Sequence, residues 1–326
     1  MRPLRILFVA ANPSIDRLYE VDRLTPGAIH RPQAVVAVPG GKGLNAARAA
    51  AGLAGRVTAI GILAGRSGDW IESALVDGGV DARWVRSGGE TRTCVSILDR
   101  SSGTMTEVYE PGGPLDPDTW TAFERAVADE LERGDVGAMA LSGSLPPGAP
   151  SDGFGRLAGL ARTAAPASRP TGALASGPIA ILADTYGPAL DAVLLERPAV
   201  VKINAAEAGD ATGIAVTDPA SGEAAAAVLI ERGATAVVIT LGPDGAVVVT
   251  PTGSSRLASP GIRGAYPVGS GDAFLGGLAV GIGRGDGLAD AARRGLAAGA
   301  ANALTPGAGE LDPLEVDRIL RELAPG

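Results

Sequence analysis

The stretch GAYPVGSGDAFLGG, residues 264–277, places three small residues and an acid where a loop is expected to become a helix: Gly269, Ser270, Gly271 and Asp272. Backbone N–H groups of successive small residues can point into one concavity, and the positive end of the following helix adds to that spot. Such a concavity can stabilise a phosphoryl group during transfer, and Asp272 could accept the proton of an attacking hydroxyl. The structural alternative is an aspartate that starts a helix after a simple turn.

Composition predicts a globular protein that does not bind nucleic acid. The chain has 326 residues, of which 46% are apolar and 20% charged, and its net charge is −8. A binding surface for nucleic acid would need a basic stripe, and none is present. With one cysteine, Cys94, and one histidine, His30, the chain can form neither an intrachain disulfide nor a zinc cluster. Cys94 lies in an apolar-alternating run and is expected to be a buried core thiol.

The chain is expected to be cytoplasmic and to have no membrane partner. The apolar run near the amino terminus covers only residues 6–11, which is shorter than the core of a signal peptide. No run reaches the about 18 apolar residues that a membrane helix needs. This first run is therefore better explained as a buried strand.

Short apolar runs alternate with helical patterns through most of the chain. Continuous apolar strands separated by helices indicate a parallel sheet covered on both faces, with ligands bound beyond the carboxyl ends of the strands. The helix candidates are GLNAARAAAGLAG (43–55), PDTWTAFERAVADELERG (117–134) and PASGEAAAAVLIERG (219–233). The strand candidates are RILFVA (5–10), VTAIGI (57–62), GAMALSG (137–143), IAILAD (179–184), AVVKI (199–203) and AVVITLG (236–242).

Three regions depart from this alternation. Residues 17–38 and 81–109 have the pattern of short strands joined by Pro-Gly and Ser/Gly turns, which predicts a small separate sheet suited to a lid over a site. Residues 165–178 are rich in Pro, Ser, Gly and Ala and are predicted to be a mobile loop.

The stretch VPGGKGLNAARAAAGLAG, residues 38–55, could bind an anion. Gly40 and Gly41 permit close backbone approach, and Lys42 lies at a predicted helix start where an anion would sit. The spacing is not that of a Walker phosphate loop, which needs a glycine five residues before the Gly-Lys pair and a Ser or Thr after it. The alternative for Lys42 is a solvated lysine in a turn.

Three further positions carry candidate chemistry. Asn204 and Glu207, in VVKINAAEAGDATG (200–213), share one face of a predicted helix start and could reach waters around Mg²⁺; the alternative is an N-cap with an acidic first turn. Asp16, in NPSID, could hold sugar hydroxyls or be a turn aspartate. Arg92, in ETRTCV, could bind an anion or form a surface ion pair.

Together, GGKGLN, SGSLPPG, the Asn-x-x-Glu pair, TLGPDG and VGSGDAFLGG resemble the ribokinase/PfkB family of sugar kinases in order and spacing along nearly the whole chain. NPSID, TPGAIHR, GGKGLN, ETRTCV and SGSLPPG are most similar to its 1-phosphofructokinase and tagatose-6-phosphate kinase branch. The resemblance implies one α/β kinase domain over residues 1–326. Its ribokinase-like parallel sheet would lie between helices, with a small β-sheet lid from about 17–38 and 81–109 that would make a homodimer.

The resemblance also implies a role for each candidate. Asp272 matches the catalytic base, and Gly269, Ser270 and Gly271 match the anion hole. Asn204 and Glu207 match the motif that organises Mg²⁺ through water. Nucleotide-binding positions are matched by Lys202, Asn204, Thr240, Gly242 and Gly245, with adenine against Leu296 and Ala300. Sugar hydroxyls would be held by Asp16, Gly40, Gly41 and Asn45, and the phosphate already on the substrate by Lys42 and Arg92 with Arg31 from the lid.

The implied activity is an ATP- and Mg²⁺-dependent phosphosugar kinase, with in-line transfer to fructose 1-phosphate giving fructose 1,6-bisphosphate. Tagatose 6-phosphate and fructose 6-phosphate remain alternative substrates. Lys42 and Arg92 argue against an unphosphorylated sugar or a nucleoside. A non-catalytic sugar-phosphate sensor would be expected to lose the base or the anion-hole glycines, which are present here. A monovalent cation is an open addition to the cofactors.

The sequence departs from the family pattern at three places. Ser270 stands where alanine is usual, Tyr266 and Pro267 replace residues that are more often Asn or Asp followed by Ser, Thr or Pro, and Ile203 replaces a proline. These changes bear on substrate choice and on the nearby nucleotide and cation contacts, and they remove no catalytic group.

Overall fold

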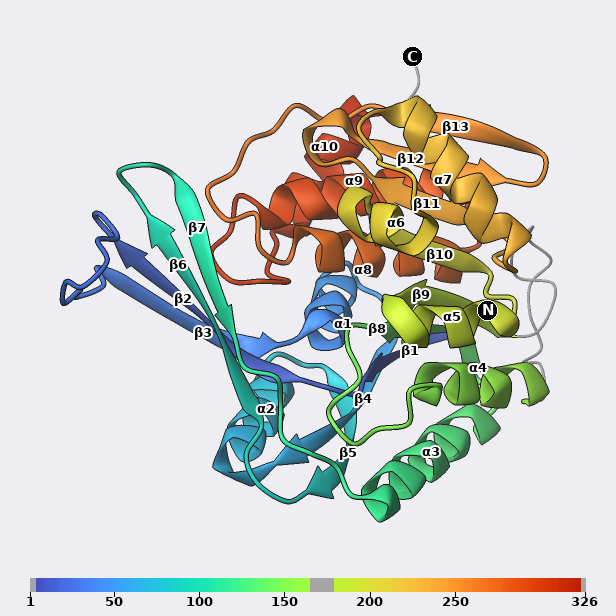
Figure 1. Cartoon of the computed structure of the whole chain (residues 1–326), viewed down its shortest axis with the longest axis horizontal. Helices are drawn as coiled ribbons and strands as arrows, with labels where there is room; N and C mark the ends of the chain where they lie inside the picture. Colours follow the sequence, from blue (N-terminus) through green and yellow to red (C-terminus); the bar gives the residue numbers. More distant parts are fainter. Residues whose placement is uncertain (1–3, 165–178, 324–326) are drawn as a thin grey trace.

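A large, mainly parallel sheet forms the centre of the molecule (Figure 1). The computed structural model describes residues 4–164 and 179–323, so the loop predicted at 165–178 lies outside the described residues. The strand order is β13-β12-β11-β10-β9-β8-β1-β4-β5, and β12 alone runs antiparallel to both of its neighbours. The strands are β1 (Arg5–Ala10), β4 (Val57–Ala64), β5 (Asp81–Ser87), β8 (Val136–Ser142), β9 (Ala180–Asp184), β10 (Val200–Asn204), β11 (Val237–Thr240), β12 (Ala246–Thr250) and β13 (Gly253–Leu257).

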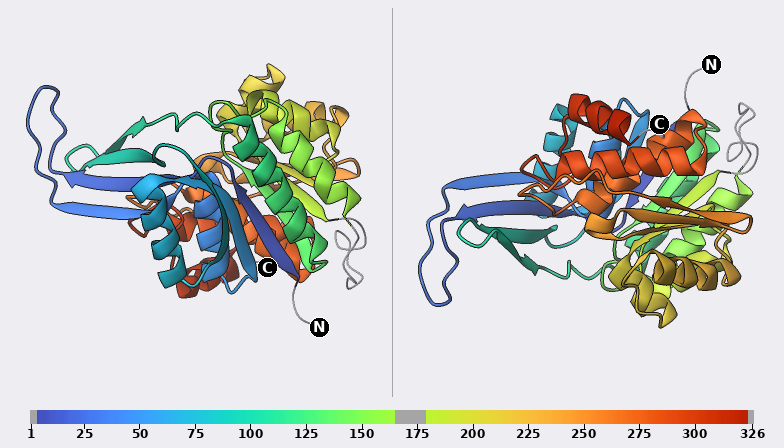
Figure 2. Two further views of the ribbon diagram at one scale, coloured as in Figure 1. Left: turned by 90° about the horizontal axis from the view of Figure 1, so that it is seen from below. Right: turned by 90° about the horizontal axis from the view of Figure 1, so that it is seen from above.

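Helices cover both faces of this sheet (Figure 2). One face carries α1 (Lys42–Gly52), α2 (Gly65–Asp77), α8 (Ser270–Arg284), α9 (Leu288–Asn302) and α10 (Pro313–Glu322). The other carries α3 (Pro117–Glu132), α4 (Gly153–Thr163), α5 (Gly187–Leu195), α6 (Ala205–Thr212) and α7 (Pro219–Glu231). Because side chains alternate along a strand, Ile6 and Phe8 of β1 enter the first core while Leu7 and Val9 enter the second. The predicted sheet between helices is confirmed.

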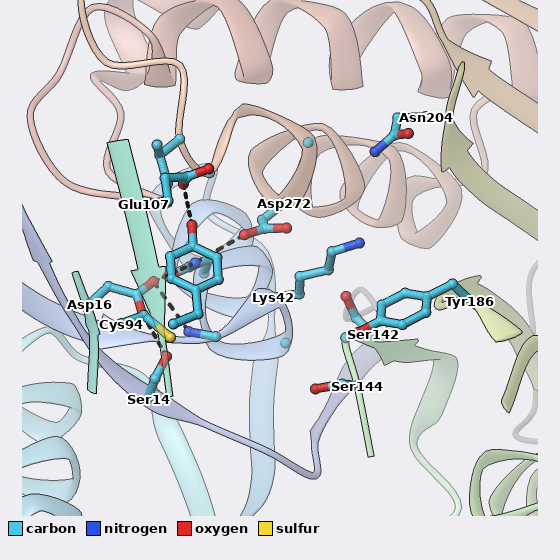
Figure 3. A pocket seen from close by; sticks show the side chains of 18 of the residues that line it. Ser14, Asp16, Lys42, Cys94, Glu107, Ser142, Ser144, Tyr186, Asn204 and Asp272 are labelled. Carbon is cyan, nitrogen blue, oxygen red and sulfur yellow. Dashed lines mark hydrogen bonds between the residues drawn. The ribbon is translucent and has the colours of Figure 1, made fainter. Parts of the chain in front are cut away.

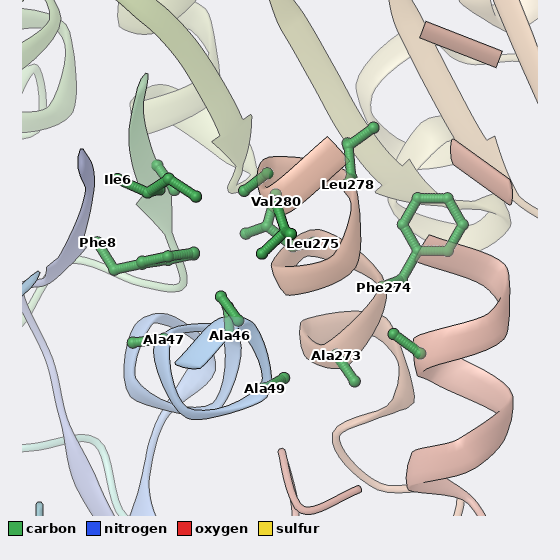
Figure 4. Packing of buried hydrophobic residues seen from close by; sticks show 14 of the residues in the cluster. Ile6, Phe8, Ala46, Ala47, Ala49, Ala273, Phe274, Leu275, Leu278 and Val280 are labelled. Carbon is green, nitrogen blue, oxygen red and sulfur yellow. The ribbon is translucent and has the colours of Figure 1, made fainter. Parts of the chain in front are cut away.

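Small residues bring α1 and α8 close together beside β1 (Figure 4). Ala46, Ala49 and Ala50 of α1 are fully buried. A Cβ at Gly276 of α8 would lie 2.7 Å from the carbonyl oxygen of Ala46, so only glycine fits there. This close packing holds the amino-terminal ends of the two helices, which carry Asn45 and Asp272, next to each other.

A second, four-stranded sheet projects from the body of the molecule (Figures 1 and 2). Its order is β3-β2-β6-β7, with β2 (Ser14–Val21) parallel to β6 (Arg92–Asp99) and antiparallel to β3 (Ala34–Gly40), and β7 (Thr104–Tyr109) antiparallel to β6. The expected range 81–109 is therefore too long for this small sheet. Residues 81–87 form β5, which pairs in parallel with β4 at the edge of the large sheet, because α2 supplies the crossover that a parallel pair needs.

Two simpler expectations concern burial and the membrane. Cys94 is buried and free, as expected of a core thiol. Within residues 4–164 and 179–323, no helix combines the length and apolar character needed to cross a membrane.

Candidate functional site

Two neighbouring cavities collect nearly all of the predicted site residues. The first, of about 760 Å³, lies between the carboxyl ends of the central strands and the small sheet. It is lined by Asp16, Gly41, Lys42, Asn45, Arg92, Lys202, Asn204, Thr240, Gly242, Gly269, Gly271 and Asp272. The second, of about 540 Å³, adds Gly245, Ser270, Leu296 and Ala300 and shares Thr240, Gly242 and Gly271 with the first. The two cavities meet at the glycine turn before α8.

An amide bridge joins the proposed base to the small sheet (Figure 3). Asn45 Nδ2 donates to Asp16 Oδ2 and to Asp272 Oδ2, each at 3.0 Å. Asp16 also accepts from Ser14 Oγ at 2.6 Å and from the Gly41 backbone N–H at 3.3 Å. A Cβ at Gly40 would overlap the Asp16 carboxylate. Asp16 and Asp272 are therefore fixed at one end of the same cavity by α1.

Asp272 is poised to exchange a proton near neutral pH. Its side chain is buried, and burial raises its pKa to about 7 against the opposing positive charge of Lys42. The helix α8 has no side-chain cap, so Asp272 is not serving as its N-cap. A carboxyl with a pKa near the working pH is suited to general-base catalysis.

The turn before α8 requires glycine at position 269 and is tight at position 271. Gly269 has a φ of 84° in the left-handed region, and a Cβ there would lie 2.6 Å from Ala308 Cα. A Cβ at Gly271 would lie 3.2 Å from Lys202 Nζ. No side chain caps this helix start, and Ser270 N–H donates to the Pro267 carbonyl at 3.2 Å, so the N–H groups of Gly269 and Gly271 are the ones left for an anion within the described residues.

Two lysines that line the first cavity, Lys42 and Lys202, are held by carboxylates behind them. Lys42 Nζ lies 3.1 Å from Asp184 Oδ1 and 2.7 Å from Glu207 Oε1, and Lys202 Nζ lies 2.8 Å from Asp184 Oδ2. Burial opposes the charge of Asp184 and Lys42 alike, but the opposite charges around them win. The pKa of Asp184 is lowered by Lys202 and Lys42, and the pKa of Lys42 is raised by Asp184 and Glu207. Lys42 is thus not the solvated turn lysine of the alternative.

Sequence reasoning missed Asp184. It is fully buried and links both lysines of the cavity. The signal was present, because Asp184 ends the apolar strand IAILAD. An acid at the carboxyl end of a parallel strand lies where such sheets bind ligands.

Asn204 and Glu207 form the helix cap that the alternative predicted. Asn204 Oδ1 accepts from the Glu207 backbone N–H at 2.9 Å, and Glu207 Oε2 accepts from the Asn204 backbone N–H at 3.0 Å. The cap leaves Glu207 Oε1 facing Lys42 in the cavity. In residues 4–164 and 179–323, no three His, Cys, Asp or Glu side chains gather to hold a metal. These residues fit a Mg²⁺ ion that keeps most of its bound water molecules and is held through them.

Arg92 and Arg31 differ in their placement. Arg92 donates to the carbonyl oxygens of Glu110 and Asn12, each at 3.0 Å, and so is not in a surface ion pair. Its buried Nε has no hydrogen-bond partner in the described part of the chain. Arg31 is exposed on the loop between β2 and β3 and lines neither cavity. A single chain therefore brings Arg92 to the site and leaves Arg31 outside it.

Most of the chain, including these site residues, matches a known protein family. Residues 9–315 match the sequence profile of the pfkB family of carbohydrate kinases. The chain belongs to this family. As a pfkB carbohydrate kinase it is a phosphotransferase acting on a sugar hydroxyl, and the family uses ATP and Mg²⁺.

Similar proteins include two phosphofructokinases and a ribokinase. A 1-phosphofructokinase from Xanthomonas campestris pv. campestris is 33% identical over 286 residues, covering 86% of this chain and 84% of the relative. Phosphofructokinase-2 from Escherichia coli, in its tetrameric inhibited form, has a TM-score of 0.85 and 29% identity and covers 98% of this chain and 99% of its own. Its potassium complex has the same TM-score and identity, and each chain is covered to 99%. Arabidopsis thaliana ribokinase with ribose and ATP, at 21% identity, TM-score 0.71 and coverage of 98% and 99%, supports the ribokinase-like fold alone.

Proposed function

We propose that this pfkB kinase phosphorylates fructose 1-phosphate to fructose 1,6-bisphosphate with MgATP. The observation that carries the proposal is one cavity that holds a carboxyl with a pKa near 7, Asp272, together with two cations, Lys42 and Arg92. The relative named 1-phosphofructokinase supports the choice of sugar phosphate.

In this proposal the sugar is oriented from the side of the small sheet. Asp16 and Asn45 bind its hydroxyls, and Asp272 accepts the proton of the hydroxyl that attacks. The new O–P bond forms at the γ-phosphorus as the bond to ADP breaks, and ADP leaves with its charge. The N–H groups of Gly269 and Gly271 hold the phosphoryl oxygens as charge builds on them.

Two ligands that both carry phosphate meet in this site, and cations would offset the repulsion between their negative charges. We assign Arg92, with its unpartnered buried Nε, to the phosphate already on the sugar. Lys42 already contacts Asp184 and Glu207. When a phosphate binds, the ammonium group of Lys42 must leave one of these two carboxylates to contact it. In this proposal Lys42 binds the phosphate already on the sugar together with Arg92.

The nucleotide is assigned to the second cavity. Leu296 and Ala300 of α9 would pack against adenine, while Lys202, Asn204, Thr240, Gly242 and Gly245 would hold the phosphates and ribose. Mg²⁺, bound through water near Asn204 and Glu207, supplies charge neutralisation. A monovalent cation stays a prediction, and rates in potassium, sodium and tetramethylammonium salts would test it.

We also propose a homodimer through the small sheet acting as a lid. Val35 and Val108 share the face of this sheet that points away from the first cavity, and both are more than half exposed, as is Ile29 in the loop that also carries Arg31. Burial of these apolar groups in a second copy would be favourable. Arg31 can serve a cavity only if movement of its loop, or a second copy, brings it there.

The test is an ADP-release assay with MgATP and a panel of fructose 1-phosphate, fructose 6-phosphate, tagatose 6-phosphate, fructose and ribose. We expect kcat/KM for fructose 1-phosphate to exceed the others by at least about tenfold. A preference for another phosphosugar would reassign the substrate, and a preference for an unphosphorylated sugar would remove the roles given to Lys42 and Arg92. No turnover, together with a rise in Tm on adding sugar phosphates, would favour a sensor.

A further inference from the structure

One buried amide holds the turn that leads into α8. Asn302 is the last residue of α9, and its side chain is fully buried. Its Nδ2 lies 3.0 Å from the carbonyl oxygen of Val268, 3.4 Å from that of Tyr266 and 3.4 Å from Ser270 Oγ. Its Oδ1 accepts from the Gly309 backbone N–H at 2.7 Å.

These contacts all converge on the backbone around Gly269. The turn is also held by Tyr266, whose N–H donates to the Ala303 carbonyl at 3.0 Å and whose hydroxyl donates to Glu20 at 2.9 Å. Within the turn and the helix start, Ser270 N–H donates to the Pro267 carbonyl at 3.2 Å and Ala273 N–H to the Gly269 carbonyl at 2.8 Å. Gly269 itself lies directly against Ala308, in the segment that the Asn302 Oδ1 bond also holds. The amide therefore ties the turn to the loop behind it with its donors on one side and its acceptor on the other.

The side chain of Asn302 lines neither cavity, so it would touch neither the sugar nor the nucleotide. A buried amide is costly unless its donors and acceptor are satisfied. Here the amide of Asn302 donates to the turn before α8 and not to its own helix α9.

We propose that Asn302 is a positioning residue for phosphoryl transfer, which sets the place of the N–H groups of Gly269 and Gly271. The inference rests on the proposed function, because it needs this turn to be the anion hole. A misplacement of reacting groups by about 1 Å can cost about a hundredfold in rate. Loss of the amide should therefore act on the chemical step more than on binding.

The test compares Asn302→Ala with Asn302→Asp. The aspartate keeps the size of the side chain and the acceptor for Gly309 N–H but removes the donors to Val268 and Tyr266. We expect kcat to fall by about ten- to a hundredfold in both variants, while KM for fructose 1-phosphate and for MgATP changes by less than about threefold. If the alanine variant does not fold, the isosteric aspartate variant decides.

Two controls separate this role from a structural one. Ile319→Val in α10 loosens the same core without touching the turn, so it should lower Tm and leave kcat unchanged. Each kcat is divided by the concentration of folded protein, which is measured by circular dichroism and by the fraction of sites that bind sugar phosphate. The proposal is overturned if Asn302→Asp keeps the wild-type kcat, or if its kcat falls only in proportion to the folded fraction.

A third variant separates failure of this inference from failure of the proposed function. Gly269→Ala places a Cβ 2.6 Å from Ala308 Cα at a φ of 84°, so the turn must shift at the anion hole itself. Loss of kcat in Gly269→Ala, corrected for folded protein, with normal kcat in the Asn302 variants overturns only the role of Asn302. Normal kcat in Gly269→Ala removes the anion hole, and the inference falls with it.

Discussion

Asp272 joins the chemistry of the site to a titration that can be measured. Burial raises its pKa to about 7, and only its deprotonated form can accept the proton of a sugar hydroxyl. We expect kcat/KM to fall as the pH is lowered through about 7, after correction for ionisation of the sugar phosphate near pH 6. A pH profile between about 5.5 and 9 measures this. A profile that stays level below pH 6.5 or so would remove Asp272 from the role of base.

The same burial predicts a cost in stability. Because the pKa of Asp272 is higher in the folded state than in the unfolded chain, the folded state binds this proton more tightly. Stability is then lost as the pH rises through about 7. Asp272→Asn keeps an acceptor for Asn45 and carries no charge, so its Tm should exceed that of the wild type at about pH 8, by a margin that shrinks at about pH 5. An equal margin at both values would show that the buried charge is not the cause.

Arg92 gives the sharpest test of the sugar-phosphate assignment. Arg92→Ala should raise KM for fructose 1-phosphate by about tenfold or more, with little change for MgATP, because a charge-assisted contact to the phosphate is lost. Arg100→Ala is a matched control, since Arg100 is a second arginine of the small-sheet region but lines neither cavity. Equal increases in both KM values would refute the assignment.

At single residues, the sequence predicted most of the residues that line the two cavities but not the ion pairs between them. Motif spacing located Asp272, Lys42 and Asn204 because each lies at a helix start, where local sequence and structure coincide. Asp184 was missed because its role depends on two lysines 142 and 18 residues away in the chain. The position of Asp184 at the end of a strand can be read from the sequence, but its pairing with two lysines at such separations is set only by the folded sheet.

At the scale of elements, one side-chain hydrogen bond joins the turn before α8 to the small sheet. Tyr266 Oη donates to Glu20 Oε1 of β2 at 2.9 Å, which joins the turn before α8 to the small sheet. Tyr266→Phe removes this bond, worth about 1 kcal/mol, so KM for the sugar phosphate should rise by about two- to tenfold. Tyr19→Phe is the control, since the Tyr19 hydroxyl has no hydrogen bond within the described residues. An unchanged KM in Tyr266→Phe would show that the bond does not hold the small sheet.

Periodicity predicted the parallel centre of the large sheet correctly, because strands buried on both faces are continuously apolar. It assigned β5 to the small sheet, because an edge strand such as Asp81–Ser87 has a half-exposed, alternating pattern. A strand of that pattern can pair in either sheet, and only the crossover through α2 decides between them.

At the scale of the whole molecule, the two cavities meet at the start of α8. In the proposed function, the substrate side is built from the small sheet and α1, and the nucleotide side from β10, β11 and α9, while α8 carries the groups between them. Each side was predictable from its own motifs. That they face one another across Asp272 follows from the close packing of α1 on α8 and from the amide of Asn45.

The most direct test of this account follows the product of MgATP and fructose 1-phosphate by phosphorus NMR, with wild-type protein and Asp272→Asn side by side. The account predicts one fructose 1,6-bisphosphate per ADP from the wild type. For Asp272→Asn we expect kcat to fall by about a hundredfold or more, with KM for the sugar phosphate nearly unchanged. Turnover in Asp272→Asn at the wild-type rate, or ADP formed without the bisphosphate, would contradict it.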